Sequence, residues 1–335
     1  MASKIDIRLT AVEIASLWTL YMSESLACCV LQYFANQTED GEILSLVRHA
    51  LTQSENNLSI ASEIIRNADL PVPDGFTAED VNADAPRLFS DPFYAYYIAD
   101  QARVGMEAYA ASLFYIARPD VRRFFSDCVE ASIKTLNMTA DILLRKGLYL
   151  RAPTVEVPKE VSYVAKPDFM AGILMRDPRP LTTIEIDNMF GCILRNHIGG
   201  LLVTGFAQVA QSDEVRGYMQ RAKELGKHHY GIFASHFERE DLPVASTHDT
   251  AVTGSTEPPF SDKLMMFHVI TLSQVSMIRY GVSLSTSMRR DVQAMYTRVI
   301  AEVGLFAQEG ADIMIANGWL EQPPQAIRHE ALSRA

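Results

Sequence analysis

The chain has 335 residues, enough for two domains of ordinary size, and 48% of them are hydrophobic, enough to fill a core in each. Its formal net charge of −11 argues against binding to nucleic acid or to an anionic membrane surface, because both need clustered lysine and arginine. No uninterrupted apolar run predicts a membrane span, no secretory signal is evident, and the four cysteines lack metal or disulfide spacing, so we expect a cytoplasmic protein.

The chain contains two copies of one sequence pattern. The first matches share an offset of 172 residues, and after a one-residue deletion the offset is 171. The matches include residues 9–14 (LTAVEI) with 181–186 (LTTIEI), 69–72 with 241–244 (both DLPV), and 89–91 with 260–262 (both FSD). An ordered series of matches with one change of register indicates a duplicated domain.

Apolar residues recur in steps of three and four, which predicts four long helices in each copy. The predicted helices are residues 10–38, 40–68, 91–117 and 120–146 in the first copy, and 182–211, 213–239, 262–287 and 290–317 in the second. Thr10 with Glu13, and Thr182 with Glu185, have the spacing of a capping box, in which a hydroxyl and a carboxylate bind free N–H groups at a helix start.

The connections between the helices predict their arrangement. Very short turns join the first helix to the second and the third to the fourth, so each of these pairs is antiparallel. The second and third helices are joined by long segments, residues 70–89 and 242–260, and about 18 extended residues can reach roughly 60 Å. A 27-residue helix is only about 40 Å long, so the connection can traverse the whole bundle. A simple up-down-up-down bundle with a floppy loop is the alternative.

We therefore predict an all-α fold of two tandem ferritin-like four-helix bundles, each with a long crossover between helices two and three. The first bundle is expected over residues 9–150 and the second over residues 181–320. A proline-rich linker, residues 151–180, should join them as a stiff connection, and residues 321–335 should form a C-terminal tail.

Several segments resemble a known family. They are residues 70–76 (LPVPDGF), 87–91 (RLFSD), 259–268 (PFSDKLMMFH) and 317–324 (NGWLEQPP). These motifs resemble domain of unknown function 3231, and the resemblance extends over residues 9–326. The resemblance implies tandem ferritin-like bundles and a source among spore-forming bacteria, where members are sometimes labelled spore-coat-like. It implies no reaction, and it adds the spore coat as an alternative location.

The first copy contains a candidate metal site. Di-iron bundles take one glutamate from each of two helices and Glu-x-x-His from the other two, and this chain has no Glu-x-x-His. We therefore predict no cofactor and keep Fe, Mn or Zn as an alternative. The rise of the helices puts Glu24, Glu55 and Glu107 at one level, where three carboxylates could meet. The competing interpretation places them on helix flanks, paired with arginine or lysine.

The second copy contains another candidate metal site, built on histidine. His197, His229 and Glu302 fall near one level, and two imidazoles with one carboxylate suit Fe(II), Mn(II) or Zn(II). The matching positions of the first copy hold neither histidine nor a carboxylate, so this site would be confined to the second copy. The competing interpretation is that these are buried, hydrogen-bonded structural histidines.

Three functions stay open. The uniform helical repeat and the family resemblance favour a non-enzymatic structural or interaction protein. The second function is a metal-binding oxidoreductase that uses either ligand set, and the third is a bundle that holds a small apolar ligand. Nucleic acid is not an expected partner, whereas self-association into a homo-oligomer and binding to spore-coat proteins are both compatible with the sequence.

Overall fold

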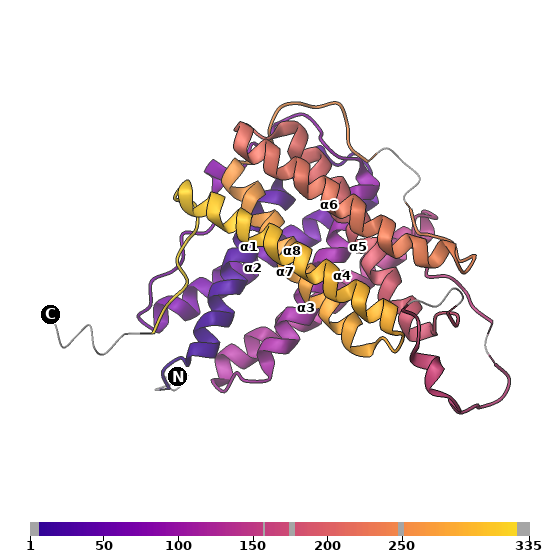
Figure 1. Cartoon of the computed structure of the whole chain (residues 1–335). Coiled ribbons are helices and arrows are strands. Elements are labelled where there is room, and N and C mark those ends of the chain that lie inside the picture. The colour runs from indigo at the N-terminus through magenta and orange to yellow at the C-terminus, as the bar shows by residue number, and fades with distance from the viewer. Residues whose placement is uncertain (1–6, 157, 174–177, 247–250, 327–335) are drawn as a thin grey trace.

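The computed structural model describes residues 7–156, 158–173, 178–246 and 251–326, and these residues contain eight long α-helices (Figure 1). The first repeat contains α1 (Ala11–Gln37), α2 (Gly41–Asn67), α3 (Asp91–Leu113) and α4 (Pro119–Arg145). The second contains α5 (Thr183–Val209), α6 (Asp213–Glu238), α7 (Asp262–Thr286) and α8 (Arg290–Ala316). Short 3₁₀ turns occur in the first crossover, η1 (Ala78–Asp80), and between the repeats, η2 (Pro167–Met170). The predicted all-α class with two tandem four-helix bundles is confirmed, although α3 ends four residues before its predicted limit.

Both predicted capping boxes are present, and each does more than start a helix. Glu13 accepts a hydrogen bond from the backbone N–H of Thr10 at 2.8 Å, and its other carboxylate oxygen accepts one from the backbone N–H of Arg118 at 2.7 Å. Glu185 caps α5 in the same way and accepts a hydrogen bond from the backbone N–H of Arg289 at 3.0 Å. One buried carboxylate in each repeat therefore ties the start of the first helix to the turn before the fourth.

The long connections run the full length of each bundle. Asp91, the first residue of α3, accepts hydrogen bonds from the backbone N–H groups of Glu39 and Asp40 in the α1–α2 turn, at 3.3 and 2.7 Å. Asp262 binds the α5–α6 turn in the same way. The third helix of each repeat thus starts at the end of the bundle that holds the first turn, whereas the second helix ends at the opposite end. The predicted crossover is confirmed.

The two crossovers also pair with each other. Val81 faces Phe260, and Phe89 faces Val252, in two isolated antiparallel bridges. Since Val252 and Phe260 stand 171 residues after Val81 and Phe89, the contact is reciprocal, as in a dimer with twofold symmetry. Backbone hydrogen bonds of 2.8 to 3.0 Å flank the bridges. The repeats are therefore related by a local pseudo-twofold axis at the crossovers.

The hydrophobic core has a central part that both repeats share. Tyr33, Phe89 and Phe93 of the first repeat and Phe260 of the second belong to one buried cluster around the crossovers. Two smaller clusters, one in each bundle, fill the outer ends. The ring of Phe89 lies against the backbone of Gly205 in α5, so closely that an added Cβ there would be 2.5 Å from it. The bundles are therefore joined through a common core as well as through the linker.

Helix α1 qualifies the expectation that no segment could span a membrane. By length and composition it is the one helix in the described parts of the chain that could cross a bilayer, with a mean hydropathy of 1.4 in its most apolar window. Half of that window is buried inside the protein, as in a core helix. The apolar character of α1 has an explanation in the bundle, because Leu17, Leu20 and Val30 are packed in the core.

Candidate functional site

The structure does not bring the three predicted carboxylates of the first bundle together. Glu24 in α1 is 5% exposed and lies between the helices, whereas Glu55 in α2 and Glu107 in α3 lie on the surface. A shared level along a bundle does not fix the direction of a side chain, which depends on the rotation of each helix about its axis. Among the residues that the structure describes, no group of three or more His, Cys, Asp or Glu side chains could hold a metal ion.

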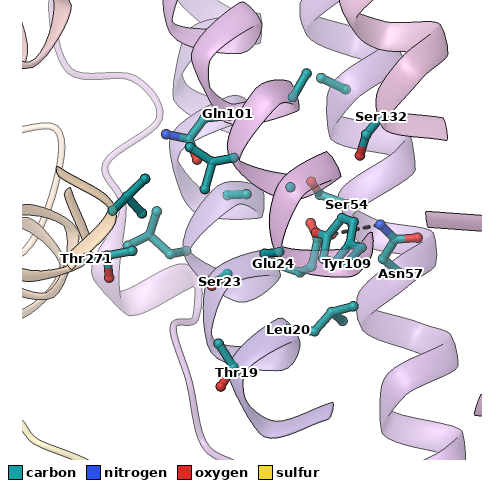
Figure 2. Close-up of a pocket in the computed structure, with 18 of the residues that line it drawn as sticks. Thr19, Leu20, Ser23, Glu24, Ser54, Asn57, Gln101, Tyr109, Ser132 and Thr271 are labelled. Atoms are coloured by element: carbon teal, nitrogen blue, oxygen red, sulfur yellow. Dashed lines mark hydrogen bonds between the residues drawn. The ribbon is translucent and has the colours of Figure 1, made fainter. Parts of the chain in front are cut away.

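Glu24 is the centre of a buried hydrogen-bond network instead. One carboxylate oxygen accepts hydrogen bonds from the side-chain amide of Asn57 and from the hydroxyl of Tyr109, both at 2.7 Å (Figure 2). The thiol of Cys128 donates to the amide oxygen of Asn57 at 3.6 Å. These four residues come from α1, α2, α3 and α4, so the network connects all four helices at mid-bundle.

The electrostatics of this network set it apart from an ordinary ion pair. Burial raises the pKa of the Glu24 carboxyl, and hydrogen bonds from Asn57, Tyr109 and Ser54 offset this only in part. All three donors are neutral, and no lysine or arginine of the described chain forms an ion pair with Glu24. Burial, together with the nearby Glu24, also raises the pKa of Cys128, so its thiol stays protonated at neutral pH. A thiol in that state is a poor nucleophile.

A cavity of about 330 Å³ opens beside the network. Its walls are α1 to α4, and α7 with Arg195 of α5 closes one end, so both repeats contribute to it. Figure 2 shows Thr271 of α7 on the opposite side of the pocket from Glu24 and Asn57. Small residues form much of the lining: Ala15, Ala27, Ala50, Ala102, Gly105 and Ala108. The cavity thus runs from the mid-bundle network to the junction of the two bundles.

In the second bundle the structure brings together two of the three predicted metal ligands. The ring of His229 is hydrogen-bonded to Glu302 at 2.8 Å, with His229 buried and Glu302 about one-third exposed. His197 is not part of this pair, and its ring faces Tyr230 at a centroid distance of 5.9 Å. Burial lowers the pKa of His229, and the contact with Glu302 offsets this in part. The pair is a hydrogen-bonded histidine and carboxylate without a third ligand within the described chain.

The two repeats hold polar groups at matching places. The residues that match Glu24, Asn57 and Tyr109 are Asn196, His229 and Tyr280. Asn196 donates a hydrogen bond to the hydroxyl of Tyr280 at 2.7 Å, so the amide takes the place of the carboxyl in the first repeat. The sequence analysis did not predict that either tyrosine contacts Glu24 or Asn196. Their match at the offset of 171 is the signal that could have identified them.

The matching place in the second bundle is largely filled. Ser132 and Thr135 of α4 line the cavity of the first repeat, and their counterparts in α8 are the larger Val303 and Phe306. The ring of Phe306 stacks on Tyr218 at a centroid distance of 4.3 Å. The space that remains there is about 80 Å³. The cavity is therefore a property of the first repeat and not of the fold in general.

The junction end of the cavity holds two contacts between the repeats that the sequence analysis did not predict. Arg195 binds both carboxylate oxygens of Asp100 at 3.1 Å, which forms an ion pair between α5 and α3. His268 in α7 is 2% exposed, and its ring lies 3.2 Å from the hydroxyl of Tyr97. Burial lowers the pKa of His268 to about 3, so the ring is neutral at physiological pH. These contacts depend on how the bundles pack, which the pattern within each repeat does not contain.

Comparisons with known proteins identify one family. The family model described as "Protein of unknown function (DUF3231)" matches residues 2–161 and again residues 169–332. A comparison with curated proteins gives no match. A solved structure from Bacillus halodurans, provisionally described as a spore coat protein, is 19% identical and covers 46% of this chain and 100% of its own. Its TM-score of 0.42 is too low to support a functional argument.

Proposed function

We propose a structural and non-enzymatic role for this chain. The proposal starts from the premise that the chain belongs to the DUF3231 family of proteins of unknown function. In this role the two bundles act as one rigid body that holds its outer helices at a fixed spacing for contact with other proteins. The observation that supports this role is the reciprocal pairing of the two crossovers inside a shared core.

The character of the junction is the reason to expect rigidity. Domains that move relative to each other usually meet through modest, polar interfaces. Here fully buried aromatic rings from both repeats pack together, with the ring centroids of Tyr33 and Phe260 5.3 Å apart. The Arg195–Asp100 ion pair adds a partly buried polar link between the same two bundles. Relative motion would break both kinds of contact.

Rigidity can be tested with the two tryptophans of the chain. Trp18 lies in α1 and Trp319 follows α8, so the variants Trp18→Phe and Trp319→Phe each leave one reporter, in a different repeat. Urea unfolding followed by fluorescence should give one midpoint in both variants, equal to the midpoint of the helical signal. Two separated midpoints would contradict the single rigid body.

The non-enzymatic part of the proposal has a separate test. The metal-dependent oxidoreductase stays the second candidate, because His229 and Glu302 lie together. Purified protein, loaded in turn with Fe, Mn and Zn, should not consume hydrogen peroxide faster than a His229→Ala variant treated in the same way. Faster consumption by the unmodified chain would favour the oxidoreductase.

For location we propose the cytoplasm, with the spore coat as the alternative. The four free cysteines support the first, because disulfides form in oxidising compartments, and the family resemblance supports the second. A tagged copy expressed in a sporulating host should stay in the soluble fraction of the mother cell. Recovery with the extracted coat would establish the alternative and would direct the search for partners to coat proteins.

A further inference from the structure

We propose that the first bundle binds a small, mainly apolar molecule that carries one amino group, with this group next to Glu24. The site lies in the cavity described above and is distinct from the structural role of the outer helices. Three independent features of the cavity support it: its size, the chemistry around Glu24, and two polar atoms at its far end.

The size fits a small molecule. An engineered cavity of roughly 150 Å³ in another protein holds benzene, so about 330 Å³ suits a ligand of about a dozen non-hydrogen atoms. Close packing is the rule in protein interiors, and a void of this size forfeits contacts along its walls. The second repeat fills the matching space with Val303 and Phe306. The fold therefore does not require the cavity. A bound molecule would explain why the first repeat has one.

The chemistry around Glu24 selects the head group of this occupant. The carboxyl is buried and accepts hydrogen bonds from Asn57 and Tyr109, which hold it in place but bring no positive charge. A protonated amine would supply that charge and form charge-assisted hydrogen bonds, which are shorter and stronger than neutral ones. Burial raises the pKa of Glu24, and a bound cation would favour its ionised form, whereas a ligand carboxylate would form no ion pair with Glu24 and would disfavour that form further. The site therefore favours a cation over an anion.

Two polar atoms near the far end of the cavity lack a hydrogen-bond partner among the described residues. They are the Nε atom of Arg195 and the Nδ1 atom of His268, and both are buried. Both residues line the cavity, at the end opposite Glu24. Buried polar atoms are nearly always satisfied in folded proteins, so two unpartnered atoms in residues of one cavity wall are exceptional and support a bound molecule at this end. Each of these atoms is almost fully covered by protein, so a ligand oxygen would reach one of them only after a small shift of the side chain.

Three probes of similar size, which differ mainly in the polar group, test the preference for an amine. They are 4-phenylbutylamine, 4-phenylbutanol and 4-phenylbutyrate, which all carry a phenyl group on a chain of four carbon atoms and have about a dozen non-hydrogen atoms. Isothermal titration calorimetry at pH 7 should show the amine binding at least about tenfold more tightly than the carboxylate, a difference of about 1.4 kcal/mol, with the alcohol between them. Equal affinities, tightest binding of the carboxylate, or no binding of the amine would overturn the proposal.

Three variants locate the binding. Glu24→Gln keeps the shape and removes the charge, and it should weaken the amine about tenfold while leaving the alcohol unchanged. Glu55→Gln is the matched control, because Glu55 is an exposed glutamate of α2, and it should bind all three probes normally. The double variant Ser132→Val, Thr135→Phe introduces the residues of the second repeat and should abolish binding of every probe. Unchanged amine binding in Glu24→Gln would refute the assignment, and if that variant does not fold, the preference among probes in the unmodified chain decides.

Discussion

Replacing Gly205 with alanine should destabilise the whole protein, although alanine is normally the better helix residue. Gly205 lies within α5, and a Cβ built there would be 2.5 Å from two ring carbons of Phe89 in the other repeat. Ordinary contacts of a Cβ atom are 3.4 to 4 Å, so the ring would have to move by about 1 Å.

The surroundings of Phe89 determine the cost of that movement. The ring is fully buried, stacks on Phe93 at a centroid distance of 4.4 Å and meets Phe34 edge-on at 6.5 Å, so its movement would disturb these neighbouring rings. Overpacking of a core costs about 1–3 kcal/mol, and alanine returns about 0.5–1 kcal/mol in a helix interior. We expect a net loss of about 1–2 kcal/mol in the free energy of unfolding.

Urea unfolding followed by circular dichroism measures this change, with Gly199→Ala as the matched control. Gly199 is in the same helix, and a Cβ there would meet nothing within 4 Å. The control should therefore be more stable than the unmodified chain by about 0.5–1 kcal/mol, so the two substitutions have opposite signs. If Gly205→Ala is as stable as the control, the close approach of the two repeats at Phe89 is wrong.

Three further substitutions test the caps, the crossover and the surface. Burial alone would raise the pKa of Glu185, but hydrogen bonds from an arginine and from the backbone lower it to about 2, so its stabilisation is present above about pH 4.5 and is lost as the pH falls towards 2. Glu185→Gln should cost about 3 kcal/mol at pH 7 and almost nothing near pH 2 in an acid series of urea melts, and a gap that does not depend on pH would contradict this cause. Tyr33→Phe removes a hydroxyl that accepts a hydrogen bond from the backbone N–H of Leu88 at 2.8 Å. The same melts should show a loss of about 1–3 kcal/mol in the free energy of unfolding, and a neutral result would mean that water satisfies this N–H. Arg145→Gln breaks an exposed ion pair with Glu42 and should change stability by less than about 0.5 kcal/mol, and a larger loss would show that the pair is coupled to the bundle.

The features that the sequence predicted well are local or repeated. The capping box of Thr10 and Glu13 depends on residues three apart, and the crossover follows from the length of one connection present in both copies. The candidate sites depend on more. Glu24 shares a helix face with Leu17 and Leu20, which are buried, but the phase of α2 turns Glu55 to the surface.

The cavity and its far end could not be predicted from the sequence. To predict the contact of Tyr109 with Glu24, one must know the rotation of α3 relative to α1. To predict the contact of His268 with Tyr97, one must know how one bundle packs on the other. No periodicity within a helix encodes either quantity. Comparison of the two repeats position by position would have helped, because it shows where small Ser132 is exchanged for larger Val303.

The shared core also sets an order of events during synthesis. The first four helices leave the ribosome complete, yet Tyr33 and Phe89 lack their partners until α5 and Phe260 follow. The end of α4 and Phe260 are separated by more than one hundred residues, and translation proceeds at about 5–20 residues per second, so the aromatic surface waits for on the order of 10 s. During that interval the nascent first bundle presents the same reciprocal surface that a second nascent chain would offer. Polysomes, where neighbouring chains emerge close together, are thus the place where mispairing between two molecules competes with correct closure of one.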